Sequence, residues 1–358
     1  MKDERLSSVR NSFNVLRLLL ATMVLIKHAE DLTGLPGIGG PGKIDIGTLA
    51  VLFFFSISGY LVTPGLVKDG IWQFLLRRFA RIYPAYILII LSLTFIFAPL
   101  WSYLETGKVQ FPVKYIFLNI VPFPQSPVSP KSMMNQLNGL PHYSSRPGIP
   151  DAPLWSLALE ITCYLALAML AVMSNRSNRF TFLQIIATVV FLFWVISLTT
   201  SWAIKDFLTK NASLSFQLLS KWPYILCFLI GILLARIPIN KWKSLYLLPI
   251  ALFATWYSGD STFKFALFGA LSVSVAAVMV GESSILARVP LRLDISYGIY
   301  LFHFPVAQSL IHFSTFEKNL VLLIFMTFVI SVIFAYLSSK LVEAPAKRMI
   351  REWGSRYL

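Results

Sequence analysis

Charge is scarce in this chain. Asp, Glu, Lys and Arg together make up 13% of its 358 residues, whereas 56% of them are hydrophobic and the mean hydropathy is +0.70. Soluble domains carry about 25% charged residues. The composition therefore excludes a soluble enzyme or a disordered protein, and it favours a protein that crosses a membrane several times.

Negatively charged residues are scarcer than positively charged ones. There are 16 of them against 31 Lys and Arg, which gives a net charge of +15. In a soluble protein such an excess would indicate nucleic-acid binding. Here the basic residues cluster between apolar runs, so membrane topology explains them better, and we expect no nucleic-acid partner.

Cysteine is nearly absent as well. The only two, Cys163 and Cys227, each lie inside an apolar run, which argues against a disulfide framework and a cysteine-based metal site. We expect no metal of any kind. The first apolar run is not followed by a small-residue cleavage site, so we expect it to remain as a span. We also expect no appended soluble domain, which places any chemistry in or at the membrane.

Long apolar runs are what the chain has in abundance. A bilayer span needs about 20 residues, with some tolerance for shorter or tilted helices. Ten runs meet or approach this length: 14–31, 47–67, 81–101, 154–173, 181–203, 222–236, 244–258, 262–280, 293–312 and 319–340. The predicted fold is all-α, a single membrane domain over 1–358 with about ten transmembrane helices.

The distribution of Lys and Arg predicts the orientation, because cytoplasmic segments carry more of them. With the N-terminus inside, the inner segments hold 19 and the outer ones 10. Both termini are then cytoplasmic, and the long loop 102–153 is extracytoplasmic. This loop is either a lid over a cavity or a plain surface loop. Its segment 111–118 could lie flat at the interface or dip into the membrane.

Two ionisable side chains bracket the first span. Arg17 and His28 are separated by ten residues, nearly all apolar, which corresponds to about 16 Å along a helix. Arg17 falls at the predicted cytoplasmic face and His28 toward the outer one. Ionisable residues inside a span tend to face a cavity, which makes both site candidates. The structural alternative is that Arg17 snorkels to the interface and His28 marks the end of the span.

Three arginines lie at the cytoplasmic end of the third span, at Arg77, Arg78 and Arg81. The positive-inside rule alone accounts for them. Arginine also binds phosphate groups through bidentate hydrogen bonds, so an anion site is the alternative. Pro84 follows, and we expect it in the first turn of a helix, where its missing N–H costs nothing.

Two further patterns favour structural roles. In segment 53–61, the small residues Ser56, Ser58 and Gly59 would let another helix approach closely, which favours packing over catalysis. Glu343 follows the tenth span, where a lone carboxylate more often pairs with a nearby Lys or Arg than takes part in chemistry.

Glu160 lies about one and a half turns into the fourth span, after Trp155, and should reach a depth comparable to that of His28. A carboxylate in an apolar run needs a partner, and His28 is the nearest candidate by depth. Such a pair fixes the imidazole tautomer and stabilises its protonated form, as a general base requires. In the ninth span His303 is also intramembrane, and Pro305 interrupts the helix hydrogen bonding just after it.

Taken together, these patterns resemble the acyltransferase 3 family of bacterial membrane acyltransferases. The resemblance covers about residues 10–348, in the order that the family shows. It rests on Arg17 and His28 at their spacing, on segments 53–61, 77–84, 154–160 and 296–305, and on Glu343-x-Pro345.

The resemblance implies transfer of an acyl group, usually acetyl, from cytoplasmic acyl-CoA. The acceptor would be a hydroxyl of a cell-surface glycan, such as lipopolysaccharide O-antigen or an exopolysaccharide. It implies a multi-pass protein of the bacterial cytoplasmic (inner) membrane, of the stand-alone type without an extracytoplasmic esterase-like domain. The implied partners are acetyl-CoA, a glycan or glycolipid acceptor and membrane lipids.

Within this reading, we expect His28 to be the general base, oriented by Glu160, with an acyl-histidine intermediate as an alternative. The expected cofactor-binding residues are Arg17, Arg77, Arg78 and Arg81. The candidates for substrate or oxyanion contacts are Ser58, Trp155, Tyr297, Tyr300 and His303.

Alternatives outside this reading stay open. The main one is a transporter or flippase of a lipid-linked sugar or small metabolite, with the intramembrane histidines and glutamate as a relay. Another is a non-enzymatic membrane subunit. A narrower one keeps the enzyme but changes the donor to a longer acyl-CoA, or the acceptor to an amine.

Overall fold

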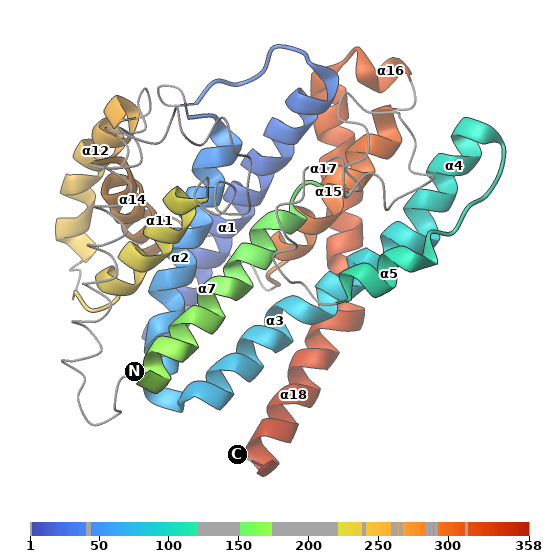
Figure 1. Ribbon diagram of the computed structural model, residues 1–358. Coiled ribbons are helices and arrows are strands. Elements are labelled where there is room, and N and C mark those ends of the chain that lie inside the picture. The colour runs from blue at the N-terminus through green and yellow to red at the C-terminus, as the bar shows by residue number, and fades with distance from the viewer. Residues whose placement is uncertain are drawn as a thin grey trace, which may run out of the picture. The chain divides into compact units, whose positions relative to one another are not determined.

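The computed structural model describes residues 2–40, 44–120, 151–173, 221–237, 241–258, 268–283, 293–311 and 314–357, with positions 264, 286 and 289. These residues form helices, turns and loops but no strand, as the composition predicted (Figure 1). Among them, five helices are long and apolar enough to cross a membrane: Ser12–Thr33, Ile46–Leu66, Ile71–Leu104, Leu154–Val172 and Leu320–Ile350. The protein is therefore a multi-pass membrane protein. The count of about ten spans and the cytoplasmic termini stay predictions, and span 181–203 lies outside the described residues.

The helices follow the predicted runs closely, and α7 matches its run at both ends. In chain order they are α1 (Lys2–Thr33), α2 (Ile46–Asp69), α3 (Ile71–Ser92), the π-helical turn η1 (Leu93–Phe97), α4 (Ala98–Thr106), α5 (Val113–Asn119), α7 (Leu154–Met173), α11 (Trp222–Leu234), α12 (Lys241–Ser258), α14 (Ala270–Glu282), α15 (Ser296–Ile311), α16 (Ser314–Glu317), α17 (Leu320–Ser338), the π-helical turn η4 (Ser339–Glu343) and α18 (Ala344–Tyr357).

Contacts divide the chain into two compact units. Unit 1 comprises residues 1–20, 39–75 and 163–292, and unit 2 comprises residues 21–38, 76–162 and 293–358. Helices α1, α3 and α7 contribute residues to both.

In unit 1, helices α2 and α11 pack closely because each carries a glycine where they meet. A Cβ atom at Gly59 would overlap the carbonyl oxygen of Phe228, and one at Gly231 would overlap that of Ser56. The Ser56 hydroxyl also hydrogen-bonds the Ser274 hydroxyl (3.0 Å). Small residues allow such an approach between membrane helices. The packing role predicted for Ser56 and Gly59 is confirmed.

This contact gives a first prediction. We expect Gly231→Ala to lower the free energy of unfolding by about 1–3 kcal/mol, because the added methyl group meets a backbone carbonyl that no side-chain rotation can move away. Thermal unfolding of the purified protein in detergent measures the loss. The matched control is Gly39→Ala, where a Cβ atom meets nothing within 4 Å. Equal melting temperatures for the two variants would contradict the prediction.

In unit 2, helices α3 and α4 run in the same direction as α15. Arg81 forms an ion pair with Asp294, just before α15 begins. Toward the other end, Trp101 Nε1 donates to Ser309 Oγ (2.9 Å). A parallel course is what the predicted topology requires of the third and ninth spans, because both should cross the membrane outward.

Helices α7 and α17 run in the opposite direction to α15. On α7, Ser156 is hydrogen-bonded to Tyr300, and Glu160, one turn later, lies near Tyr297, one turn earlier. Helix α17 lies beside α15 in Figure 1. These directions also agree with alternating spans.

Helix α3 begins earlier than the sequence suggested. It starts at Ile71, so the expectation that Pro84 occupies a first turn is wrong, and Pro84 lies within the helix. The continuous helical stretch Ile71–Leu104 has 34 residues, or about 50 Å. Because a bilayer core is about 30 Å thick, the arginine-bearing start of α3 can extend beyond it.

After α4 the chain turns back on itself. Helix α4 ends at Gly107, which adopts the left-handed conformation (φ +68°). The ring of Phe111 then contacts that of Phe95 (6.3 Å between centroids), and Ile120 O accepts from Tyr83 Oη (3.1 Å). Segment 111–120 thus returns along α3 over about 18 Å. The two alternatives for segment 111–118, lying flat at the interface or dipping into the membrane, both stay predictions.

Candidate active site

The two intramembrane histidines contact each other in unit 2. His28 Nδ1 on α1 lies 2.7 Å from His303 Nε2 on α15, and the two ring planes differ by only 7°. The hydrogen bond therefore lies close to both ring planes, where the nitrogen lone pairs point. His303 is completely buried, whereas His28 is partly exposed. The pair joins a buried ring to a more accessible one.

A backbone carbonyl fixes the proton positions in this pair. His303 Nδ1 lies 3.0 Å from Ile299 O, which can only accept, so this nitrogen carries a hydrogen. The neutral ring is favoured because a fully buried imidazolium would lose its hydration. His303 Nε2 is then an acceptor, and His28 Nδ1 must donate to it. The lone pair of His28 is therefore on Nε2, where a general base needs it.

Local packing holds the His28 ring. Phe304 contacts it edge-on, with centroids 5.1 Å apart and planes at 81°. Ala29 and Ala307 are in one buried cluster, and such small residues let α1 approach α15 closely. Helix α1 ends shortly afterwards, where Gly34 adopts the left-handed conformation (φ +68°) that terminates helices.

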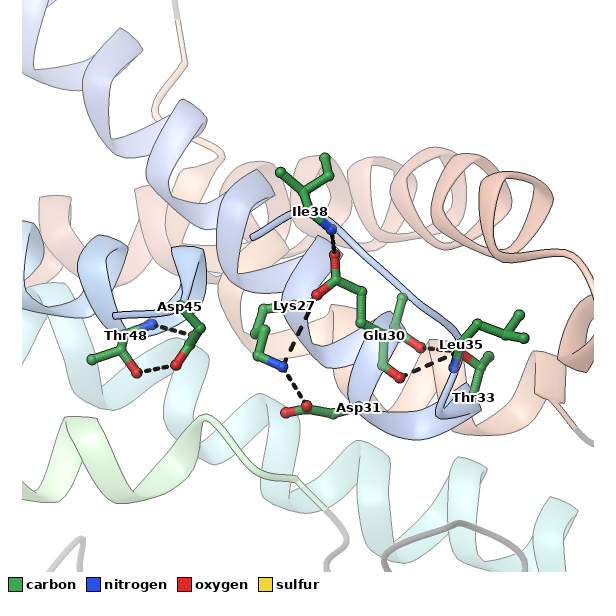
Figure 2. A network of polar contacts seen from close by, with 9 residues as sticks. Lys27, Glu30, Asp31, Thr33, Leu35, Ile38, Asp45 and Thr48 are labelled. Carbon is green, nitrogen blue, oxygen red and sulfur yellow. Dashed lines mark hydrogen bonds and ion pairs between the residues drawn. The ribbon is translucent and has the colours of Figure 1, made fainter. Parts of the chain in front are cut away.

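Charged residues adjoin His28 in the sequence at this end of α1, and Figure 2 shows the contacts that they make. Lys27 Nζ lies 2.5 Å from Asp31 Oδ1 and 4.0 Å from Glu30 Oε2. Glu30 Oε1 also accepts a hydrogen bond from Ile38 N (2.5 Å), which ties the loop after α1 back onto the helix. Lys27 thus lies close to two carboxylates within the turn of α1 that follows it.

Glu160 lies in the same unit, on α7. It is partly buried, and its charge acts on the Tyr297 hydroxyl, which donates to Ile82 O (3.0 Å). Tyr297 precedes His303 by about 9 Å along α15. Because His303 binds His28 Nδ1, the orienting role that we predicted for Glu160 is filled on that side by His303. A contact between Glu160 and His28 stays a prediction.

Arg81 is the predicted phosphate ligand whose partner is clearest. Its Nη2 lies 3.2 Å from Asp294 Oδ2, and its charge also reaches the Tyr297 hydroxyl. Asp294 Oδ1 accepts from the Ser296 hydroxyl in turn. Arg81 is thereby held at the first turn of α15, the helix that carries His303.

The other predicted arginines differ in their surroundings. Arg78 on α3 is partly buried, whereas Arg77 is exposed. Arg17 belongs to unit 1, where its Nη1 donates to Asn14 Oδ1 (3.3 Å). Ser58 also belongs to unit 1. The proposed roles of all four stay predictions.

Besides Tyr297, two of the predicted oxyanion contacts, Tyr300 and His303, have partners in unit 2. The Tyr300 hydroxyl is 2.6 Å from Ser156 Oγ, next to the exposed Trp155. His303 engages both ring nitrogens, with Ile299 O and with His28, so its geometry assigns it an orienting position rather than an oxyanion contact.

Glu343 contacts neighbouring side chains of its own helical segment. It is buried at the end of η4, where it accepts from Lys347 Nζ (3.2 Å) and from Ser338 Oγ (3.1 Å). The interpretation that this glutamate pairs with a neighbouring cation is confirmed.

Sequence reasoning missed two buried polar groups, Asp151 and Tyr115. Each is only 3% exposed. Within the described part of the chain, neither carboxyl oxygen of Asp151 nor the Tyr115 hydroxyl has a hydrogen-bond partner. Burial raises the pKa of both groups well above their usual range, and the charge of Asp151 further raises the pKa of Tyr115. Asp151 begins an Asp-Ala-Pro sequence before a span, which is typical of an ordinary turn. The sequence around Asp151 therefore did not indicate a buried carboxyl group.

The comparisons with known proteins decide the family. The family described as "Acyltransferase domain", acyltransferase 3, matches residues 10–340. The chain belongs to this family. It is similar to an "O-acetyl transferase" of Shigella phage Sf6, with 26% identity over 318 residues, 84% of this chain and 86% of the relative.

A second relative of this acyltransferase is "Nodulation protein 10" of Rhizobium leguminosarum bv. viciae, which is 28% identical over 336 residues, 86% of each chain. No solved structure matches the chain significantly. The resemblance inferred from ordered motifs is therefore confirmed at the level of the family.

Proposed function

We propose that this acyltransferase moves an acetyl group from cytoplasmic acetyl-CoA to a hydroxyl of a cell-surface glycan, such as lipopolysaccharide O-antigen or an exopolysaccharide. The bacterial inner membrane is the expected location. The observation that carries the proposal is the His28–His303 hydrogen bond, because it leaves a basic nitrogen on a partly exposed ring. The name of the Sf6 phage relative supports an acetyl group and an oxygen acceptor.

The proposed chemistry is direct transfer with general-base catalysis. His28 Nε2 takes the proton of the acceptor hydroxyl as its oxygen attacks the thioester carbonyl. The tetrahedral intermediate then collapses, the carbon–sulfur bond breaks, and the proton on Nε2 passes to the departing CoA sulfur. Proton transfer by a positioned base is typically worth about 10²–10⁴-fold.

Neighbouring groups stabilise the imidazolium that forms on His28. His303 accepts from Nδ1 throughout, as an orienting residue does in serine hydrolases. The carboxylates of Glu30 and Asp31, which contact Lys27, lie within the next turn of the same helix. We keep Glu160 as a further proposed carboxylate of this centre, because its helix contacts α15 through Tyr300, one turn before His303.

The donor is proposed to bind at the arginine end of unit 2. Acetyl-CoA has a phosphate-rich head and a long thin arm, and arginines are suited to its phosphates. Arg81 lies at the first turn of α15, and about 13 Å along that helix separate its partner Asp294 from His303. The arm can cover such a distance and bring the thioester to His28. No metal is needed for this transfer.

Family membership supports transfer over the transporter alternative. The experiment that tests the proposal incubates the purified protein in lipid nanodiscs with [¹⁴C]acetyl-CoA. We expect saturable binding and slow release of labelled acetate, because water can replace the missing acceptor. Labelling of glycolipid should follow when bacterial glycolipid extracts are added. A protein that neither binds acetyl-CoA nor turns it over would overturn the donor assignment.

Arg81 gives a second prediction. We expect Arg81→Ala to weaken acetyl-CoA binding about 10- to 100-fold, because charge-assisted hydrogen bonds contribute about 1.5–3 kcal/mol. Equilibrium binding of labelled acetyl-CoA in nanodiscs measures it. The matched control is Arg348→Ala, an exposed arginine on α18.

Asp294→Asn separates phosphate binding from mere ion pairing. If Arg81 holds phosphate, removing the charge of Asp294 should preserve or tighten binding, because the guanidinium loses a competing anion. If Arg81 only anchors α15, both variants should bind acetyl-CoA equally poorly, and the phosphate role would be rejected.

A further inference from the structure

The proposed mechanism leaves one buried carboxyl group unused. Asp151 and the nearby Tyr115 are each 3% exposed, and in the described part of the chain both carboxyl oxygens and the phenol oxygen lack hydrogen-bond partners. Buried polar groups in native proteins are nearly always satisfied, because leaving them unpaired is costly. A ligand that supplies the missing hydrogen bonds would explain why these groups are kept.

The Asp151 side chain does not cap α7. Helix α7 begins at Leu154, so its N-cap position is Pro153 and not Asp151. The backbone carbonyl of Asp151, not its side chain, accepts from Leu154 N (3.5 Å). The carboxyl group is thus available for another role.

An aromatic side chain lies near both groups. Tyr86 acts electrostatically on Tyr115, and Asp151 acts on Tyr86. The Tyr86 hydroxyl is already used, because it donates to Asn119 O (2.7 Å). Sugars suit polar groups beside an aromatic ring, because they present hydroxyl groups at their edges and C–H groups on their faces.

Two segments that are distant in the sequence bring these groups together. Tyr115 lies on α5, whereas Asp151 lies in the non-helical residues before α7, and Asp151 acts electrostatically on the Tyr115 hydroxyl.

Asp151 is also within reach of the histidine pair. Five residues of chain separate it from Ser156, a span of at most about 17 Å. Ser156 Oγ is 2.6 Å from the Tyr300 hydroxyl, and the Tyr300 ring centroid is 6.2 Å from that of His303. One or two sugar rings could bridge this separation.

We propose that Asp151 and Tyr115 form the acceptor subsite, where they bind neighbouring hydroxyl groups of a pyranose sugar and direct another hydroxyl of that sugar toward His28 Nε2. This inference rests on the proposed acetyl transfer and names the residues that would select its acceptor. A subsite built to hydrogen-bond a hydroxyl discriminates strongly against a sugar that lacks it.

The test separates acceptor use from donor chemistry. Purified wild type, Asp151→Asn and Tyr115→Phe in nanodiscs receive [¹⁴C]acetyl-CoA, alone or with methyl glycosides of glucose, galactose, mannose, rhamnose and N-acetylglucosamine. Label released as acetate reports the donor reaction, and label on the glycoside reports transfer. Tyr103→Phe is the matched control, because Tyr103 is 57% exposed on α4.

We expect at least one glycoside to accept the label. For that glycoside, Asp151→Asn should raise KM at least tenfold and Tyr115→Phe about threefold, with acetate release unchanged. An unchanged KM in Asp151→Asn would overturn the inference. So would an equal loss of transfer and acetate release. If wild type releases acetate but labels no glycoside, the sugar subsite is rejected and the donor proposal stands. If it releases no acetate and binds no acetyl-CoA, the proposed function itself fails.

Thermal unfolding without acceptor gives an independent readout. Removing an unsatisfied buried carboxyl group should stabilise the free protein, as often happens when a functional group is replaced. We expect Asp151→Leu to raise the melting temperature by about 3 °C. A lower melting temperature would show that Asp151 is structural and would overturn its role as a subsite.

Discussion

His28→Ala is expected to lower the rate of acetyl transfer by about 10²–10⁴-fold while leaving acetyl-CoA binding intact. The reason is that His28 alone presents a lone pair on a partly exposed ring, whereas its partner His303 is fully buried with both nitrogens engaged. Transfer of label from [¹⁴C]acetyl-CoA under saturating donor measures the rate, and equilibrium binding measures the affinity.

Chemical rescue with imidazole shows whether His28→Ala loses activity because the base is missing or because the packing of α1 has changed. His28→Gly leaves space beside Phe304, whose ring contacts the imidazole in the native protein. Added imidazole should restore part of the transfer in this variant and none in His303→Gly. Full activity of His28→Ala would show that the histidine is structural, and the catalytic interpretation would be rejected.

His303→Phe is expected to cost about 10²-fold or more in kcat with little change in KM. Phenylalanine preserves the volume and apolar surroundings but offers no acceptor to His28 Nδ1. The His28 proton can then move to Nε2, which places the lone pair on the wrong side of the ring. Loss of the correct tautomer in a serine protease costs about 10⁴-fold. Steady-state kinetics of acetyl transfer at several donor concentrations separate kcat from KM.

His303→Gln is the variant to compare with His303→Phe. The glutamine side chain can place its amide oxygen near the position of His303 Nε2 and accept from His28, so it should recover part of the activity that His303→Phe loses. Equal activity in the two variants, or a loss that appears only in KM, would show that His303 does not set the tautomer.

Much of the fold could be predicted because a bilayer requires long apolar helices. The close approach of α2 and α11 was also foreseeable, since Ser56 and Gly59 are small residues in an apolar run. The beginning of α3 was not, because Arg77, Arg78 and Arg81 interrupt the apolar pattern although the helix continues through them. An apolarity criterion finds the part of a helix in lipid and misses the part beyond it.

The sequence likewise predicted some features of the candidate site and not others. His28 stood out because an ionisable residue in a span is rare. His303 was also a candidate, but its contact with His28 was not foreseen, because the two lie 275 positions apart in the sequence. Depth in the membrane alone suggested Glu160 as the partner of His28. Asp151 gave no signal, because its significance lies in the hydrogen bonds that it lacks.

The tautomer of His28 can be read from ¹⁵N NMR of the histidine rings in nanodiscs, which needs no acceptor. The chain has four histidines, so selective labelling gives few signals, and single His→Gln variants assign them. We predict a neutral His28 ring with hydrogen on Nδ1 and an unprotonated Nε2, and a shift of this tautomer in His303→Phe. Hydrogen on His28 Nε2 in the wild type, or no response to His303→Phe, would contradict this prediction.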